Sequence, residues 1–234
     1  MVPRSDEVID LTCIFLTVNK VPQKWTEFHK EKMLEAIGDY PLITVSAVPM
    51  LDLPGVNIIQ QEPFNTSNIY KQMLRAAKLA TTPFIAIIED DSLYPSEHFH
   101  SFRPQMDEFA YNYTRWGLLS WGEPTYYWTH RISNLTLIAP RELAIQCLEE
   151  RFAKYPDGTP PEVTGEMGRH RISRVLGLPE YKIAEFYTTL PIVNMSHVDA
   201  LDPHEQRMKK RRGFVRAYDI PLWGHASELQ KLFQ

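Results

Sequence analysis

The sequence predicts an α/β fold, a single domain in which helices flank a mixed, mostly parallel sheet. Over the first hundred residues, short apolar runs with strand character alternate with longer segments of helical periodicity, the pattern that builds a parallel sheet. The length of 234 residues suits one α/β domain with a sizeable core. One apolar run, at 84–88, leads directly into three acidic residues, and α/β sheets bind ligands at such strand ends.

The first elements follow in order along the chain. Residues 9–18 are apolar and rich in β-formers, so they predict a buried strand. Residues 25–37 have helical spacing and predict a helix. Residues 43–48 and 56–59 predict two further strands, because prolines and a glycine punctuate the chain between them.

The next helix and strand form half of an α/β unit. Residues 65–80 predict an amphipathic helix, and residues 84–88 predict a buried strand bounded by Pro83 and Pro95. The apolar face of that helix comprises Ile69, Met73, Ala76, Ala77 and Ala80.

The acidic residues after this strand are Glu89, Asp90 and Asp91. Consecutive carboxylates at the end of a buried strand repel one another, and a hard divalent cation with oxygen ligands removes that repulsion. A solvated acidic turn would give the same triplet. The setting, a helix followed by a strand, favours a metal or ligand site.

The second half of the chain is rich in aromatic residues. Residues 96–99 predict a short helix that reaches toward Phe109. Residues 133–139 predict a strand, and residues 140–152 a helix with proline at its first turn. Between these segments, tyrosine and tryptophan side chains either fill a core or line a sugar or nucleobase site.

Composition narrows the class of protein. Hydrophobic residues make up 44% and charged residues 23% of the chain, as in a globular domain. The net charge of −4 gives no global electrostatic case for nucleic-acid binding. Cys13 and Cys147 lie in apolar contexts and predict buried thiols of a reducing compartment. No run resembles a signal peptide or is long enough to span a bilayer, so we expect a cytoplasmic protein.

The run from Thr82 to Phe99, with the helix before it, resembles the nucleotide-sugar half of GT-A glycosyltransferases, in particular the family 2-type enzymes. Those enzymes carry an Asp-x-Asp-like motif, often followed by a hydrophobic residue and then proline and histidine, as Leu93, Pro95 and His98 stand here. The resemblance is close over about residues 65–99 and weaker over most of the chain.

This resemblance implies a Rossmann-like domain of GT-A type over residues 1–234. About residues 1–100 would form the nucleotide-sugar half, and about residues 101–234 the acceptor half with a basic C-terminal loop. It also implies a nucleotide-sugar donor, Mn²⁺ or Mg²⁺, and a set of site residues. Asp91 would ligate the metal, and Glu89 or Asp90 would contact ribose or metal. Thr17, Val18, Asn19 and Asn68 would contact the nucleotide sugar, and Trp121 and Tyr126 are the candidates for contact with the acceptor.

The segment around Gly165-Glu166 resembles the Gly-Glu-Asp region of the family, whose acid is the catalytic base of inverting members. A base is needed to deprotonate the acceptor hydroxyl as it attacks the anomeric carbon. Met167 departs from this pattern, because the family usually has aspartate there. Glu162 is the alternative base, and a helix N-terminus with Glu166 in its first turn is the alternative structural interpretation.

A histidine just after a strand matches the third metal ligand of several GT-A families. Residues 183–193 contain a predicted strand, and His197 follows it. Neutral imidazole coordinates transition metals, so His197 would suit Mn²⁺ beside Asp91. His225 is the rival ligand.

Residues 207–216 form the one strongly basic run, with Lys209, Arg211 and Arg212 at its centre. It would cradle the diphosphate of a nucleotide sugar, bind a polyanion such as DNA, or simply be a solvated helix face. The first alternative fits the rest of the chain best.

Four functions remain open from the sequence, and one of them is a degenerate, non-catalytic GT-A domain that only binds a ligand. The favoured one is an inverting, metal-dependent transfer of sugar from a nucleoside-diphosphate sugar, with UDP the expected nucleotide, to a hydroxyl of a glycan or of a hydroxylated base in DNA. A nucleotidyltransferase of the same fold would usually carry a glycine-rich loop after the first strand, and residues 17–24 contain no glycine. A non-catalytic nucleic-acid-binding domain would use the basic run. Oligomeric state is not predicted.

Overall fold

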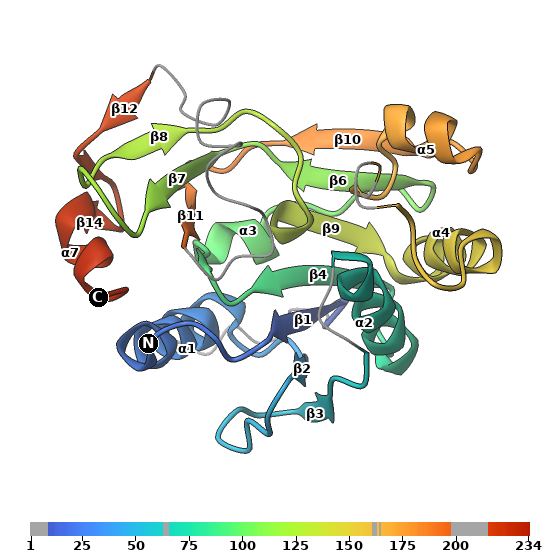
Figure 1. The fold of residues 1–234 in the computed structure, drawn as a ribbon, viewed down its shortest axis with the longest axis horizontal. Helices are drawn as coiled ribbons and strands as arrows, with labels where there is room; N and C mark the ends of the chain where they lie inside the picture. The colour runs from blue at the N-terminus through green and yellow to red at the C-terminus, as the bar shows by residue number, and fades with distance from the viewer. Residues whose placement is uncertain (1–8, 63–65, 161–162, 164, 198–214) are drawn as a thin grey trace.

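A computed structural model describes residues 9–62, 66–160, 163, 165–197 and 215–234 (Figure 1). Its centre is a seven-stranded sheet with the order β10-β6-β9-β4-β1-β2-β3. Six of these strands run in one direction and β9 runs in the other. The predicted mixed, mostly parallel sheet with flanking helices is therefore confirmed.

The parallel block of this sheet comes from the first ninety residues. Its strands are β1 (Leu11–Thr17), β2 (Leu42–Ser46), β3 (Val56–Ile59) and β4 (Phe84–Glu89). Every residue of β1 and β2 is buried, because helices cover both faces of the sheet. This double coverage explains why these strands read as continuous apolar runs.

The remaining strands of the large sheet are β6 (Glu108–Asn112), β9 (Leu137–Pro140) and β10 (Lys182–Phe186). Beside them lies a five-stranded sheet with the order β12-β8-β7-β11-β5. Its strands are β5 (Ser92–Leu93), β7 (Arg115–Leu119), β8 (Tyr126–Trp128), β11 (Ile192–Ser196) and β12 (Arg216–Ala217), and a two-stranded ribbon joins β13 (Asp219–Ile220) to β14 (Gly224–His225).

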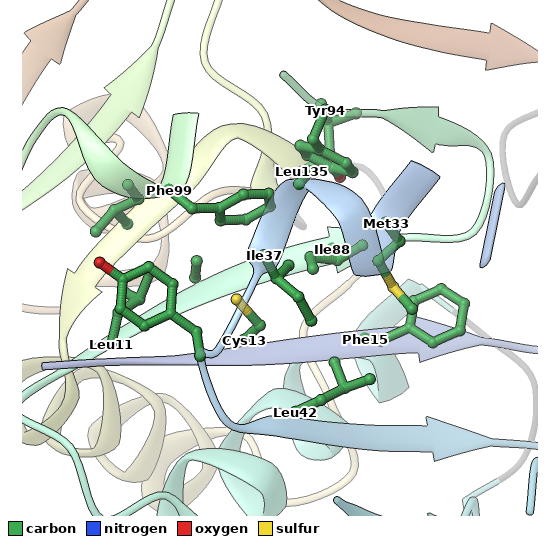
Figure 2. Packing of buried hydrophobic residues seen from close by; sticks show 14 of the residues in the cluster. Leu11, Cys13, Phe15, Met33, Ile37, Leu42, Ile88, Tyr94, Phe99 and Leu135 are labelled. Carbon is green, nitrogen blue, oxygen red and sulfur yellow. The ribbon is translucent and has the colours of Figure 1, made fainter. Parts of the chain in front are cut away.

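The helices pack on opposite faces of the large sheet. Side chains of α1 and α3 belong to one core cluster, and those of α2 and α4 belong to the other. Figure 2 shows the first cluster, in which the buried Cys13 thiol lies among side chains of α1, β1 and β4. The helices are α1 (Gln23–Ile37), α2 (Thr66–Leu79), α3 (Ser96–His100), α4 (Arg141–Lys154), α5 (His170–Leu176) and α7 (Ala226–Lys231), with a 3₁₀ turn η1 (Asn134–Thr136).

Three details differ from the sequence predictions. The helix that begins at Ser96 ends at His100 and does not approach Phe109, which lies in β6. The first part of the strand predicted at 133–139 is the turn η1, in which the Thr136 hydroxyl donates to the Ser133 carbonyl at 3.0 Å. The hydroxyl competes with strand pairing, so β9 begins only at Leu137. The third difference concerns Glu166, which precedes α5 rather than lying in its first turn.

A search of the described helices for a membrane span found none of sufficient length and apolar character.

Candidate functional site

Three half-buried carboxylates mark the carboxyl edge of the parallel block. Glu89 is the last residue of β4, and Asp90 and Asp91 form the turn into β5. Two side chains of helix α1 hold the backbone of this turn. The Trp25 indole donates to the Asp90 carbonyl at 2.7 Å, and the His29 ring is 2.9 Å from the Ser92 carbonyl.

The acids disturb one another's ionisation. Burial raises the pKa of Glu89 to about 8 and that of Asp90 to about 7, and the Asp91 charge adds to both rises. Burial also raises the pKa of Asp91, while the charge of His197 acts against that rise. The three carboxyl groups therefore ionise less readily than free carboxyls, and a cation would compete with protons for the same oxygens.

A pocket of about 240 Å³ opens between the end of β1 and the first turns of α1. Thr17, Asn19 and Asp90 supply polar groups to its wall, and Phe15 and Met50 supply apolar ones. The Thr17 hydroxyl donates to an Asp90 carboxylate oxygen at 2.5 Å and accepts from the Asn19 backbone N–H at 2.9 Å. These contacts tie the loop after β1 to the acidic turn.

Asn19 adopts a left-handed backbone conformation, with a φ of 55°. Asparagine tolerates this region better than most residues. Its side-chain oxygen accepts from the Val48 N–H at 3.0 Å, which joins the loops after β1 and β2. The resemblance placed Thr17 and Asn19 in the nucleotide site, and the structure brings both to the pocket that Asp90 lines.

His197 is within electrostatic range of Asp91. Strand β11 pairs antiparallel with β5, and the Met195 N–H donates to the Asp91 carbonyl at 2.7 Å. The Asn194 side chain hydrogen-bonds the Asp91 carboxylate. His197 follows this strand and is 7% exposed.

The rival histidine lies elsewhere. The His225 ring accepts from the Ser227 N–H at 3.3 Å and so caps α7. Within the described part of the chain, no group of three or more His, Cys, Asp or Glu side chains is arranged to hold a metal ion. Asp91 and His197 are thus a pair of possible ligands rather than a complete protein shell.

Glu166 comes from the second half of the chain. It lies in the turn before α5 and forms an ion pair of 2.9 Å with Arg169, and 18% of its side chain is exposed. Its negative charge raises the pKa of Glu89 and of Tyr113. Glu166 is therefore within electrostatic range of the acidic turn.

Arg115 was missed in the sequence. It opens β7 and is 2% exposed, and among the described residues its Nε atom has no hydrogen-bond partner. Burial lowers its pKa to about 10, and its charge lowers the pKa of Glu89. An arginine inside the otherwise apolar Arg-Trp-Gly-Leu-Leu strand was the available signal, because a buried cation needs a nearby anion.

The two candidates for acceptor contact, Tyr126 and Trp121, differ in burial. Tyr126 is fully buried, and its hydroxyl donates to the Gly224 carbonyl at 3.1 Å. That ring packs in the core with side chains of β11 and α7, so it presents no exposed surface to an acceptor. Trp121 is half-buried in the loop between β7 and β8, and Asn68 is buried in α2. Glu162, Lys209, Arg211 and Arg212 lie outside the described residues.

No protein-family model and no curated protein matches the sequence. Solved structures that it resembles include a mannosyltransferase from Pyrobaculum calidifontis in complex with GDP-mannose and Mn²⁺, at 13% identity and a TM-score of 0.45. The likeness covers 86% of this chain and 60% of the mannosyltransferase, so this chain spans less than two thirds of that protein.

Two others are a glycosyltransferase involved in glycosylation of the PBCV-1 major capsid and the bifunctional IspDF of Campylobacter jejuni. The first is 12% identical with a TM-score of 0.43 over 78% of this chain and 93% of that one. The second is 9% identical with a TM-score of 0.43 over 76% and 50%. Glycosyltransferases, the kind of protein that residues 65–99 resemble, thus recur among these structures. At such identities and scores the functional conclusion has to come from the site itself.

Proposed function

We propose that this protein is a metal-dependent glycosyltransferase that moves a sugar from a nucleoside-diphosphate sugar to an acceptor hydroxyl. The observation that carries the proposal is the adjacency of two features at the carboxyl edge of the parallel block. Asp90 lines the pocket with Thr17 and Asn19, and Asp91, the next residue, is within electrostatic range of His197. We call these five residues the donor-side region.

The donor set in this region suits a divalent cation. Carboxylate oxygen is the preferred ligand of Mg²⁺ and Mn²⁺, and imidazole favours the transition metal. Asp91 and His197 would hold the ion, and diphosphate oxygens and water would fill its remaining positions. When bound, the cation would offset the charge that builds on the departing diphosphate.

The other residues have separable tasks. The pocket would hold the nucleoside. The Asp90 carboxylate would accept a hydrogen bond from a ribose hydroxyl, and the Thr17 hydroxyl would keep that carboxylate in place. Glu166 would take the proton of the acceptor hydroxyl as its oxygen bonds to the anomeric carbon and the bond to the diphosphate breaks. Attack from the face opposite the leaving group inverts the anomeric configuration. UDP is the nucleotide we expect, and Arg115 would balance the charge of the assembled acids.

The first test is thermal stability with nucleoside diphosphates and nucleotide sugars, with and without Mn²⁺. A ligand that binds only the native state raises the melting temperature. We expect one nucleotide to stabilise the wild type in a Mn²⁺-dependent way, and Asp91→Asn to abolish the Mn²⁺ dependence and lower sugar transfer by at least about 100-fold. Absence of any nucleotide-dependent shift in the wild type would refute the donor site.

A matched pair of threonines on β1 tests the pocket. Thr17 hydrogen-bonds Asp90 in the pocket. Thr12 lies in the same strand but away from the pocket, and its hydroxyl hydrogen-bonds that of Thr82 at 2.7 Å. Loss of one hydrogen bond to a charged group costs about 1.5 kcal/mol or more, which is about tenfold or more in affinity. Thr17→Val should weaken nucleotide binding about tenfold, and Thr12→Val should leave it unchanged even if stability falls. Equal nucleotide affinities in the two variants would place the nucleotide elsewhere.

A further inference from the structure

Four aromatic side chains from distant parts of the chain meet on the surface. We name Tyr113, Trp128, His130 and Tyr187 the aromatic strip. The His130 ring centroid is 4.8 Å from that of Tyr113 and 5.1 Å from that of Trp128, and Tyr113 is 6.0 Å from Tyr187. The strip is therefore a continuous series of ring contacts.

The strip lies where the two sheets join. Tyr113 links β6 to β7, Trp128 ends β8, and Tyr187 follows β10, strands that lie next to one another along one border of the molecule (Figure 1). Backbone hydrogen bonds hold the junction. The Tyr113 N–H donates to the Phe186 carbonyl at 3.0 Å, and the Thr129 N–H donates to the Arg115 carbonyl at 3.1 Å. The rings thus stand on rigid elements.

These rings do not serve the core in the way that Tyr126 does. Trp128 is 39% and Tyr187 is 58% exposed, His130 is exposed, and only Tyr113 packs partly on a core cluster. A series of exposed aromatic rings marks a binding surface, because each ring offers an apolar face beside a polar atom.

Carboxylates accompany the strip. Glu185 accepts from the Tyr187 hydroxyl at 3.2 Å and also hydrogen-bonds Tyr113. At its inner end, Tyr113 lies within electrostatic range of Glu166, and the exposed Arg131 follows His130 on the chain. Carboxylates accept hydrogen bonds from sugar hydroxyls and repel phosphates, so this arrangement favours a carbohydrate over a nucleic acid.

We propose that the aromatic strip binds the acceptor, and that the acceptor is an oligosaccharide. The sugar that carries the reacting hydroxyl would lie beside Glu166 and Tyr113, and further sugars would stack outward on His130, Trp128 and Tyr187. This inference rests on the proposed glycosyltransferase function, since Glu166 as base sets where the chain of sugars begins.

The test is oligosaccharide binding by calorimetry, with maltohexaose, cellohexaose, chitohexaose and mannohexaose as probes and glucose as the short control. At least one hexasaccharide should bind the wild type, and more than tenfold more tightly than glucose. Trp128→Ala and Tyr187→Ala should each weaken that binding about tenfold, and Trp128→Phe should retain most of it because a ring remains.

Tyr218→Ala is the matched control. Tyr218 is 56% exposed and donates its hydroxyl to Glu123 at 2.8 Å, much as Tyr187 does to Glu185, but it lies outside the strip. Its substitution should leave binding unchanged. The proposal is overturned if none of the four hexasaccharides binds, if the strip variants bind as the wild type does, or if a single-stranded dT12 oligonucleotide is the ligand whose binding they weaken.

The nucleotide melting shift separates this inference from the function on which it rests. Trp128→Ala and Tyr187→Ala should keep the wild-type shift with nucleotide and Mn²⁺. A normal shift without oligosaccharide binding would overturn the acceptor assignment alone. Oligosaccharide binding without any nucleotide shift would overturn the transferase function and leave a carbohydrate-binding surface.

Discussion

The donor-side region and the aromatic strip are built in opposite ways. The donor-side region gathers buried and half-buried polar side chains at the ends of β1, β4 and β11, and α1 holds the backbone of its acidic turn. The aromatic strip gathers exposed rings that have few fixed partners and come from the seam between two sheets. The difference suits the two ligands that we propose, because a diphosphate needs compensating charge, whereas a neutral sugar chain needs flat apolar surface with scattered hydrogen-bond acceptors.

The charge of Glu166, the proposed base, acts on Glu89 and on Tyr113. Its replacement gives the largest expected effect of the tests that compare the two regions. Glu166→Gln removes the base while keeping the shape of the side chain. Proton transfer by a positioned base contributes about 10²- to 10⁴-fold, so kcat for sugar transfer should fall by about 1,000-fold. The nucleotide melting shift and hexasaccharide binding should both stay near wild type, which would show that only the chemical step is lost.

The control for this variant is Glu180→Gln. Glu180 is also in the second half of the chain and forms an exposed ion pair with Arg174. Its removal should leave kcat unchanged. If Glu166→Gln retains normal transfer, the base must be another acid, and Glu162 is the first to test.

Replacement of the two histidines sharpens the donor side. His197→Ala should weaken Mn²⁺ binding by about 10- to 100-fold in the presence of nucleotide, because it removes the imidazole beside Asp91. His225→Ala should change the stability of α7 through loss of its cap, and not the Mn²⁺ affinity. Mn²⁺ titration followed by electron paramagnetic resonance measures both. If His225→Ala weakened Mn²⁺ binding and His197→Ala did not, the metal ligand would be His225 in the ribbon of β13 and β14.

The smallest expected effect is a pH dependence of stability. The folded-state pKa values of Glu89 and Asp90, about 8 and about 7, are higher than the unfolded values of 4.5 and 3.8. Between about pH 6.5 and 8.5 the folded protein therefore binds more protons than the unfolded chain, and the free energy of unfolding falls as pH rises. We expect a loss of about 1 kcal/mol, since water reaches part of each carboxylate.

The pH range of 6.5 to 8.5 is chosen because two buried histidines change the free energy of unfolding in the opposite direction at lower pH. Burial lowers the pKa of His29 to about 4 and that of His98 to about 3, so each opposes the acids below pH 6.5, where unfolded histidine takes up protons. Urea unfolding at pH 7, 7.5, 8 and 8.5 tests the fall, and Glu89→Gln should reduce it. Stability that rises over this range would contradict the pKa shifts.

The sequence located the donor-side region better than the aromatic strip, and the reason is physical. Buried parallel strands are apolar throughout, so Glu89, Asp90 and Asp91 at the end of β4 are conspicuous. Thr17 and Asn19 follow β1 in the same way. Strand ends in a parallel block lie at one edge of a sheet, and local sequence is enough to place them there.

The rings of the strip have no such local signature. Tyr113 and Tyr187 are 74 residues apart and meet only because β10 pairs with β6, a pairing that periodicity does not reveal. An aromatic residue in a short strand reads alike whether it faces the core or the solvent. Tyr126 and Trp128 lie two residues apart in β8, so strand alternation assigns them to one face, yet their exposed fractions are 0% and 39%. Burial, and not residue type, distinguishes a core aromatic residue from one of the aromatic strip.

The pairing of β5 with β11 has a consequence for how the protein acquires its site. Asp91 and His197 come together only when Asn194 lies opposite Ser92, a pairing across 102 positions of the chain. Such long-range closure is slow and depends on register, because a slip of one residue would turn every side chain of β11 to the opposite face. The proposed metal ligands Asp91 and His197 would thus come together late in folding, after the parallel block, so that a newly made chain would not hold the proposed ion before its second sheet has closed in the correct register.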